Sequence, residues 1–157
     1  MAKKFYSRKK PAHPPVWLNL NCPIIVFVTV CTKNRKPILA RPEVHDLLKQ
    51  TWETACGWLV GKYIIMPDHV HLFCSPAYPE APDIGKWVQY WKTLVSRRWP
   101  WPEEQPIWQR DFWDRKLRKE EKYLEKWMYV FLNPVRKGLV EKPEEWPFSG
   151  ELNYLRW

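Results

Sequence analysis

Hydrophobic residues change their spacing repeatedly along the chain, and each change predicts a new element of secondary structure. Residues 24–32 alternate with a period of two, which is typical of a strand. From Pro42 the hydrophobic positions recur every three or four residues, which predicts a helix. Residues 58–66 and 69–75 return to strand character, and the Pro67-Asp68 pair between them indicates a reversal that pairs these two strands antiparallel.

The second half of the sequence predicts two further helices and one short strand. Asp83 is a favourable N-cap for a long helix whose apolar positions continue to Val95. Residues 106–112 have the pattern of a short edge strand, and residues 118–132 that of a third helix, which the ring of Pro134 stops. The apolar stripe expected to pack this third helix consists of Leu124, Trp127, Met128, Phe131 and Leu132.

The resulting order is strand, helix, strand, strand, helix, strand, helix. This order predicts an α+β fold, an antiparallel β-sheet with helices packed mainly on one face. The chain has 157 residues, which is enough for one domain with a hydrophobic core of its own and too few for two domains of ordinary size. We expect a basic, proline-rich N-terminal arm over residues 1–23 and a single domain over residues 24–157.

Composition narrows the class of protein. Hydrophobic residues make up 45% and charged residues 27% of the chain, which is typical of a globular protein. The longest apolar run, residues 24–31, is too short to span a membrane and no cleavage site follows it, so we expect a cytoplasmic protein without a membrane partner. The four cysteines are scattered without a CxxC pair, which argues against a zinc ribbon and for reduced thiols.

The charge of the chain indicates the chemistry of its partner. Its net charge is +9 with a pI near 9.4, which favours an acidic partner, most economically a nucleic acid. Twelve tryptophans accompany this charge, and indoles can stack on unpaired bases, although most are expected in the core.

Two of the four histidines, His69 and His71, lie two residues apart in a predicted strand. Side chains at this spacing share one face, about 7 Å apart at Cα, while Val70 points to the opposite, buried face. Both imidazoles can therefore converge on one small ion. An isolated pair of this kind also occurs as ordinary half-buried strand histidines, so a chemical role requires a third ligand and a nucleophile elsewhere in the chain.

A candidate nucleophile and a candidate third ligand both occur at the end of the third predicted helix. Tyr129 lies off the apolar stripe and four residues before Asn133, so the two share a face one turn apart. An ordinary surface tyrosine is the plain alternative. If this face packs toward the histidine strand, Asn133 supplies an oxygen that completes a metal site. A divalent ion, with Lys122 or Lys126, would then favour the phenolate of Tyr129 as a nucleophile toward a phosphate.

Two motifs in this sequence resemble those of the IS200-like transposases. The first is His69-Val70-His71 within the segment 66–72, and the second is Tyr129-x-x-x-Asn133-Pro-Val-Arg-x-Gly-Leu-Val, which follows about 60 residues later. The branch that the sequence resembles most is the REP-associated tyrosine transposases, members of the single-tyrosine HUH endonuclease superfamily. The resemblance extends from the first predicted strand to residues 146–149 and so covers most of the chain.

The resemblance implies a ferredoxin-like or RRM-like HUH transposase fold and a role for each of these residues. His69, His71 and Asn133 would be metal ligands, with Asn133 where other members tend to have glutamine, and the metal would be Mg²⁺ or Mn²⁺. By ligand softness alone, two imidazoles would also accept zinc. Tyr129 would attack a phosphodiester of single-stranded or hairpin DNA, giving a 5′-phosphotyrosine link and a free 3′-OH. Relatives act as a monomer or as a homodimer, and we favour the monomer.

Basic residues spread along the chain are candidates for contacts with DNA phosphates, which would make affinity fall steeply with salt. The segment 108–118 matches the family except at Arg115, where relatives often have histidine. Lys92 matches a basic position on the second helix, although a solvated lysine explains it equally well. The candidates are Arg35, Lys36, Lys92, Arg97, Arg98, Arg115, Lys116, Arg118, Arg136 and Lys137.

Three functions fit these features. The first is a metal-dependent single-stranded DNA endonuclease and strand transferase, and the second is a domesticated relative that binds structured nucleic acid without useful cleavage. The third, a hydrolase that activates water, fits the histidines but leaves Tyr129 without a role. The complete set of His69, His71, Asn133 and Tyr129 favours the first function, since a pure binding protein has no need of all four.

Overall fold

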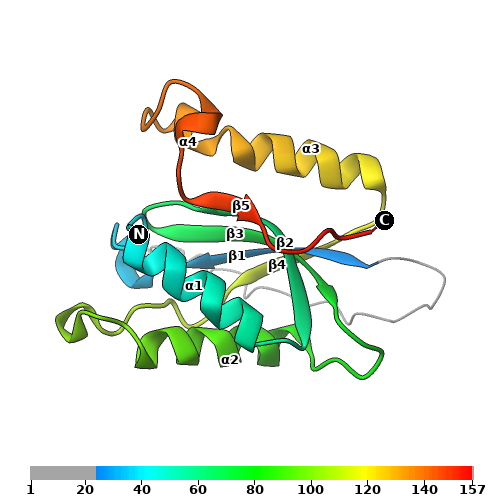
Figure 1. Ribbon diagram of the computed structural model, residues 1–157, viewed down its shortest axis with the longest axis horizontal. Coiled ribbons are helices and arrows are strands. Elements are labelled where there is room, and N and C mark those ends of the chain that lie inside the picture. The colour runs from blue at the N-terminus through cyan, green and yellow to red at the C-terminus, as the bar shows by residue number, and fades with distance from the viewer. Residues whose placement is uncertain (1–23, 157) are drawn as a thin grey trace, which may run out of the picture.

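The computed structural model of the protein describes residues 24–156, and its centre is a five-stranded antiparallel sheet (Figure 1). The predicted N-terminal arm, residues 1–23, lies outside the described residues. The strand order across the sheet is β4-β1-β3-β2-β5. The strands are β1 (Ile25–Cys31), β2 (Trp58–Ile65), β3 (His69–Pro76), β4 (Trp113–Leu117) and β5 (Ser149–Glu151).

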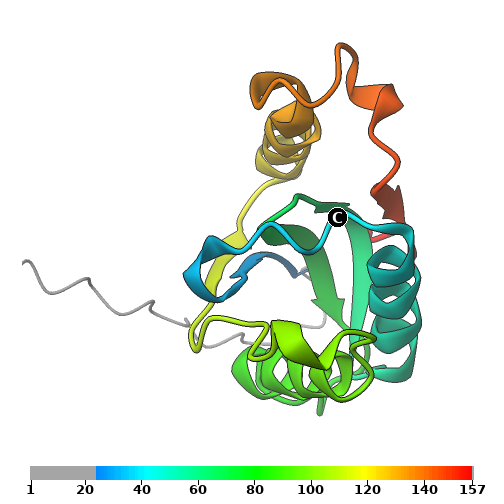
Figure 2. The ribbon, with the colours of Figure 1, turned by 90° about the vertical axis from the view of Figure 1, so that its left-hand side faces the viewer.

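Two long helices cover one face of the sheet and a third lies over the other face (Figure 2). The helices are α1 (Pro42–Thr54) and α2 (Ile84–Arg97) on the first face, α3 (Glu120–Phe131) on the second, and the short α4 (Asn133–Arg136) directly after α3. The structure confirms the α+β class and the antiparallel sheet with helices mainly on one face. The order β1-α1-β2-β3-α2-β4 is the split β-α-β arrangement of ferredoxin-like folds.

Alternation along β1 divides its side chains between two cores. Val26 and Val28 point to the first face, where they pack with α1 and α2 in the larger core. Ile25 and Phe27 point to the second face and pack beneath α3 in the smaller core. Val70 of β3 lies in the larger core, so its two histidine neighbours point toward the α3 side.

The sequence-based prediction is wrong at the two edges of the sheet. Residues 106–112 form an isolated bridge, between Trp108 and Thr32, rather than a strand, and the edge strand is β4 directly after them. The sequence of β4 is Trp-Asp-Arg-Lys-Leu, in which polar residues replace the hydrophobic period of a buried strand. The edge strand β5, in the region predicted as turns, is only three residues of Ser-Gly-Glu, so its sequence carries no apolar signal.

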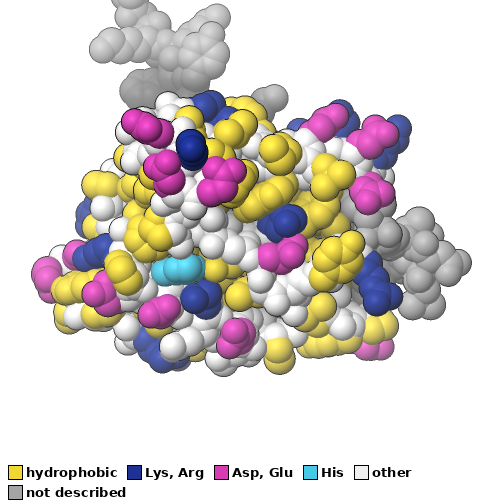
Figure 3. Space-filling model, turned by 45° about the horizontal axis from the view of Figure 1, so that its top comes forward, with side chains coloured by type: hydrophobic (Ala, Val, Ile, Leu, Met, Phe, Trp, Pro, Cys, Tyr) yellow, Lys and Arg dark blue, Asp and Glu magenta, His cyan; other side chains and the backbone are white. Residues whose placement is uncertain are grey.

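Helix α3 turns a different side to the sheet than its apolar stripe predicts. Tyr123 and Val130 are buried and Trp127 is partly buried, whereas Leu124 and Met128 are 51% and 54% exposed. Figure 3, which brings the α3 side forward, shows hydrophobic side chains at the surface among charged ones. Two apolar series overlap on this helix, and helical spacing does not distinguish them. Tyr123 and Trp127 determine which side of α3 faces the sheet, because both pack edge to face on the ring of Phe73 in β3.

No helix within residues 24–156 is long and apolar enough to cross a membrane. Cys31, Cys56 and Cys74 are free thiols in the part of the chain that the structure describes. Helix α3 ends at Phe131, close to the end predicted from Pro134, and Pro134 then opens α4, where a missing backbone N–H costs nothing.

Candidate active site

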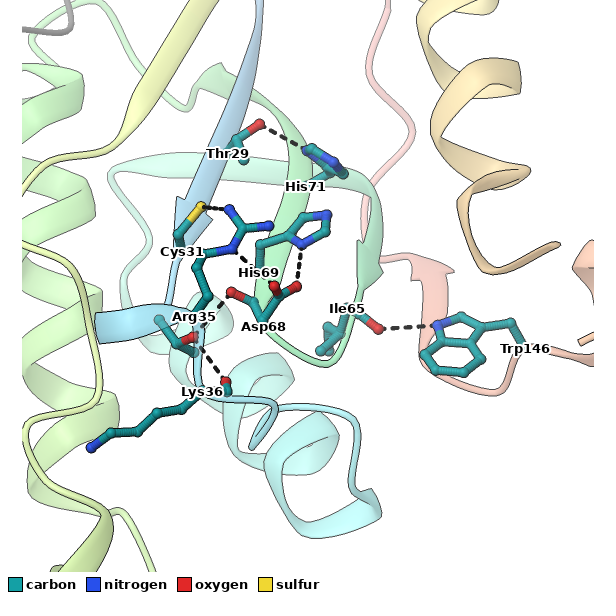
Figure 4. Close-up of polar contacts among 10 residues, drawn as sticks. Thr29, Cys31, Arg35, Lys36, Ile65, Asp68, His69, His71 and Trp146 are labelled. Carbon is teal, nitrogen blue, oxygen red and sulfur yellow. Dashed lines mark hydrogen bonds and ion pairs between the residues drawn. The ribbon is translucent and has the colours of Figure 1, made fainter. Parts of the chain in front are cut away.

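The two histidines of β3 lie side by side on the α3 side of the sheet (Figure 4). Their ring centroids are 4.6 Å apart, with the ring planes inclined at 75°. His69 is buried and His71 is half-buried. The two imidazoles thus share one face, as their two-residue spacing predicts.

Each imidazole is oriented through its Nδ1 atom. Nδ1 of His69 lies 2.7 Å from Oδ1 of Asp68, and Nδ1 of His71 lies 2.8 Å from Oγ1 of Thr29 on the neighbouring strand. Phe27 stacks on the ring of His71 with a centroid distance of 5.2 Å. With both Nδ1–H groups donating to these oxygens, both Nε2 atoms keep a lone pair for a cation, the arrangement in which proteins usually hold ligand histidines.

Burial keeps both imidazoles neutral at pH 7. Desolvation, helped by the charges of His69, Lys126 and Arg35, lowers the pKa of His71 to about 3. The pKa of His69 is also lowered by burial, although its hydrogen bond to Asp68 opposes the shift. A neutral imidazole is the form that binds a metal ion, so the environment of the pair suits that use.

Arg35 and Asp68 form a second layer behind His69. Nε of Arg35 donates to Oδ2 of Asp68 at 2.8 Å, and Nη1 donates to Sγ of Cys31 at 2.9 Å. Burial alone raises the pKa of Asp68, but the hydrogen bonds from His69 and Arg35 outweigh it and the net shift is downward. Asp68 is therefore a carboxylate that accepts from both neighbours at once.

Tyr129 lies on α3 and is 59% exposed. Nζ of Lys126, one turn before it, lies 5.7 Å from the centroid of the Tyr129 ring and 4.9 Å from that of Phe27. Phe27 in turn stacks on His71. Lys126 therefore connects the tyrosine side of α3 to the histidine side of the sheet.

Arg136 joins Tyr129 to Asn133 across the break between α3 and α4. Its guanidinium carbon lies 3.9 Å from the centroid of the Tyr129 ring. Nη2 of Arg136 donates to the carbonyl oxygen of Tyr129 at 2.5 Å and to Oδ1 of Asn133 at 2.7 Å. The phenol, the amide and the guanidinium thus form one cluster on the side of the molecule that carries the histidines.

The candidate metal ligands combine two imidazoles with one amide. Within residues 24–156 no group of three or more His, Cys, Asp and Glu side chains is placed to hold a metal ion. The third candidate is Oδ1 of Asn133, an amide oxygen that has a second lone pair besides the one that Arg136 uses. Two neutral imidazoles and an amide oxygen fit a divalent cation.

The predicted DNA-binding cations do not form one patch. Arg35 and Arg136 belong to the clusters above, Lys137 lowers the pKa of His69 by its charge, and Arg115 is exposed on β4 opposite Phe27. Lys92 is buried, and its Nζ donates to the carbonyl oxygens of Gln109 at 2.6 Å and Arg110 at 3.3 Å, so it holds that segment against α2. Nζ of Lys36 donates to the carbonyl oxygen of Glu104, and Nη2 of Arg98 donates to Oε1 of Gln50. Lys116 pairs with Val26 and so points to the face opposite the histidines, Arg97 ends α2, which covers that opposite face, and Arg118 follows β4.

Sequence reasoning missed three residues that support the histidines, namely Phe27, Thr29 and Asp68. Asp68 has a signal in the sequence, because it directly precedes the first histidine. Phe27 and Thr29 have none, because their place beside His71 depends on the register of β1 against β3.

A family model and two relatives match much of this chain. The family model described as "Transposase IS200 like" matches residues 23–121, which include both histidines and end before Tyr129. A REP-associated tyrosine transposase of Escherichia coli (strain K12) is 26% identical over 127 residues, covering 78% of this chain and 73% of that protein. A protein of Haemophilus influenzae is 33% identical over 97 residues, covering 54% of each chain.

A solved structure shares the fold. It is the structure of a REP-associated tyrosine transposase bound to a REP hairpin, with a TM-score of 0.68 and 22% identity, covering 87% of this chain and 82% of that one. Since the family model spans well over half of the chain, including the strand that carries the histidine pair, the chain belongs to the IS200-like transposase family.

Proposed function

We propose that this protein is a metal-dependent endonuclease and strand transferase for single-stranded DNA, with Tyr129 as its nucleophile. One observation carries the proposal: a histidine pair held through its Nδ1 atoms faces the side of the sheet on which α3 and α4 bring Tyr129, Asn133 and Arg136 into one cluster. Membership of a transposase family supports it. A binding protein has no need of this combination.

The proposed reaction exchanges one phosphoester for another. Oη of Tyr129 gives up its proton and attacks the phosphorus of a DNA phosphodiester, the bond from phosphorus to O3′ breaks, and the leaving O3′ takes up a proton. The 5′ end of the DNA then stays on the tyrosine as a phosphotyrosine, so the energy of the broken bond is kept and the strand can be rejoined by the reverse step. Lys126 and Arg136, the cations beside the ring, attract the negatively charged phosphate toward the attacking oxygen.

His69, His71 and Asn133 are the residues that we propose to hold a divalent cation, Mg²⁺ or Mn²⁺. When bound, such an ion polarises a phosphoryl oxygen and orients the phosphate for in-line attack. The protein's own part is to hold the imidazoles neutral and fixed: Asp68 orients His69, and Thr29 and Phe27 orient His71.

DNA that contains a hairpin is the proposed substrate class. A protein of similar fold has been solved bound to a REP hairpin. The net charge of +9 suits a polyanion, and the cations Arg115, Arg136 and Lys137 stand around the histidine face to neutralise phosphates.

We further propose that residues 24–157 work as one catalytic domain, as a monomer in the cytoplasm, with residues 1–23 as a basic arm. The histidines and the tyrosine of one chain lie on the same side of its sheet, which supports catalysis within one subunit. Light scattering of the purified full chain, alone and with hairpin DNA, tests the monomer.

The experiment that tests the function uses labelled hairpin DNA with a single-stranded extension, incubated with the protein and Mg²⁺ and separated on a denaturing gel. We expect a covalent protein–DNA band that disappears in Tyr129→Phe and in the presence of a chelator. Tyr154→Phe is the matched control, because Tyr154 is 82% exposed and lies beyond β5. It should form the band as the wild type does.

Two other results would reject the proposal. Cleavage that survives Tyr129→Phe would indicate a hydrolase that uses water, and tight binding without cleavage would indicate a binding protein. In His69→Ala and His71→Ala, hairpin binding should persist while strand scission stops. Unimpaired scission in either variant contradicts the ligand role.

A further inference from the structure

Trp113 stands out among the tryptophans of residues 24–156 because its side chain is exposed. It is 53% exposed, whereas tryptophans such as Trp87 and Trp91 are at most 2% exposed in the larger core. An indole left in water contributes little to folding, since its large apolar surface stabilises the protein only when it is buried. Packing therefore does not explain this residue at the edge of the sheet.

The strand register places Trp113 in the same row as His71. Trp113 begins β4 and pairs with Thr29 of β1, and Thr29 pairs on its other side with His71 of β3. Directly opposite residues of antiparallel strands point to the same face. Two strand spacings, about 10 Å in all, separate the backbones of Trp113 and His71, so the indole lies on the histidine face and beside the histidines.

The sheet around Trp113 is uncovered and basic. Along β4 the exposed side chains on this face are Trp113 and Arg115, whereas Leu117 is buried in the core beneath α3. Arg115 pairs with Phe27, and Lys126 lies over the ring of Phe27. An exposed aromatic ring flanked by cations is the combination with which proteins bind single-stranded nucleic acid, the ring stacking on a base and the cations contacting phosphates.

We propose that Trp113 is a stacking platform for an unpaired base of the DNA strand whose phosphate is bound at the histidines, with Arg115 contacting the adjoining phosphate. The inference rests on the proposed function, in that the strand passes the histidine pair. A stacked strand advances about 3.4 Å per nucleotide, so a separation of about 10 Å puts the stacked base within about three nucleotides of the phosphate that is cleaved. The indole offers a face that any base can use, so it selects unpaired over paired nucleotides rather than one sequence.

The test measures binding, without cleavage, of a labelled DNA hairpin that carries a single-stranded extension, in the presence of a chelator. Trp113→Ala should weaken binding of this probe about tenfold, and Trp113→Phe should keep most of the affinity because it keeps an aromatic face. Trp113→Leu separates stacking from simple apolar contact and should behave like Trp113→Ala. The matched control is Tyr154→Ala, an exposed aromatic residue beyond the opposite edge strand, which should bind as the wild type does.

An abasic scan distinguishes stacking from a general effect on the fold. Each unpaired nucleotide of the probe is replaced in turn by an abasic site. At one position the replacement should weaken wild-type binding about tenfold and should not weaken binding to Trp113→Ala any further, because the partner base is already unused. At the other unpaired positions the two losses should add.

Three results would overturn the inference: wild-type affinity in Trp113→Ala, losses that add at every abasic position, or an equal loss on a blunt hairpin without an extension. Failure of the proposed function is a separate outcome. It would appear as a missing phosphotyrosine band in the wild type, while the chelated binding assay would still report whether Trp113 stacks on a base.

Discussion

Asp68 and Arg35 show how much of the protein is organised around one histidine. Asn34 and Arg35 have φ values of 57° and 53°, in the left-handed region that non-glycine residues rarely adopt. Such residues cost of order 1–3 kcal/mol each and persist only where the surroundings fix them. Here the turn brings the guanidinium of Arg35 onto Asp68 and Cys31, and Asp68 holds His69. The strained turn therefore helps to orient His69, a proposed metal ligand.

Replacing Asp68 tests this chain of contacts at the residue scale. In Asp68→Asn the charged acceptor of His69 is lost together with the ion pair to Arg35, so we expect cleavage to slow by about 10- to 100-fold, the usual cost of losing a carboxylate behind a ligand histidine. Single-turnover cleavage of hairpin DNA measures the rate. Asp46→Asn, an exposed aspartate on α1, is the control and should cleave at the wild-type rate. An unchanged rate in Asp68→Asn would remove Asp68 from the site.

For single residues, the sequence predicts which side chains share a face of one element, but not how two strands are aligned against each other. That His69 and His71 share a face follows from their spacing alone, and that Tyr129 and Asn133 lie one turn apart follows from helical geometry. The contact of Thr29 with His71 needs the alignment of two strands that are 42 residues apart in the chain. No local pattern contains that alignment, so the residues that orient the histidines come only from the structure.

At the scale of elements, the junction of α3 and α4 is the feature that shapes the site. Pro134 interrupts the helix after Tyr129, and the new helix turns Arg136 back toward the old one. The guanidinium of Arg136 then contacts the ring of Tyr129, the backbone carbonyl oxygen of Tyr129 and the side chain of Asn133. Both hydrogen bonds come from Nη2, while the same guanidinium lies over the ring.

Arg136→Lys keeps the charge of this junction and removes its geometry. A lysine cannot bond Tyr129 and Asn133 while lying over the ring, so we expect the cleavage rate to fall by about tenfold, whereas hairpin affinity, which depends on charge, falls much less. Gel quantification of the covalent band and an equilibrium binding curve measure the two quantities. If Arg136→Lys cleaves as fast as the wild type, the junction does not position the nucleophile.

A second junction, between the turn η2 (Pro102–Glu104) and the start of α1, predicts a pH effect on stability. Hydrogen bonds from Arg41, with one from Trp99, lower the pKa of Glu104 below its usual 4.5. A lowered folded-state pKa contributes stability above pH 4.5 that is lost as the pH falls through the folded-state value. Glu104→Gln should therefore destabilise the protein by about 1 kcal/mol at pH 7 and by less at pH 3. Denaturant unfolding at both pH values measures it, with the exposed neighbour Glu103→Gln as the control. An equal loss of unfolding free energy at pH 7 and pH 3 would show that the ion pair between Arg41 and Glu104 does not stabilise the fold.

The elements that sequence could not predict share one physical property. The strands β1, β2 and β3 are central, so their hydrophobic periods are strong, and α1 and α2 each bury one clear stripe. The edge strands β4 and β5 are paired on one side only, so few of their positions need to be apolar, and their sequences look like loops. The apolar pattern of α3 does not identify the side that packs on the sheet, because the helix exposes part of its apolar surface.

Over the whole molecule, the sheet separates a large core from a small one, and the two have different roles. The large core joins α1 and α2 to the sheet and contains most of the buried tryptophans. The small core fixes α3 through Tyr123, Val130 and the partly buried Trp127. Tyr129, the proposed nucleophile, is thus carried by the less firmly attached helix, and the two histidines by the rigid centre of the sheet, while Asn133 lies in α4 directly after α3. Such an arrangement lets the tyrosine adjust to a bound strand while the two histidines stay in place.

A pair of matched valines tests this division. Val88 of α2 and Val130 of α3 are both at most 1% exposed, so either Val→Ala change removes a similar apolar volume. Val88→Ala should lower the free energy of global unfolding by about 2 kcal/mol, since the large core holds the whole fold. Val130→Ala should instead speed amide hydrogen exchange in α3 and leave exchange in β1 and β3 nearly unchanged, because α3 can open without the sheet. Exchange followed by mass spectrometry measures both variants. Equal acceleration in α3 and in the central strands of Val130→Ala would mean that the molecule opens as one unit, and Tyr129 would then be as fixed as the histidines.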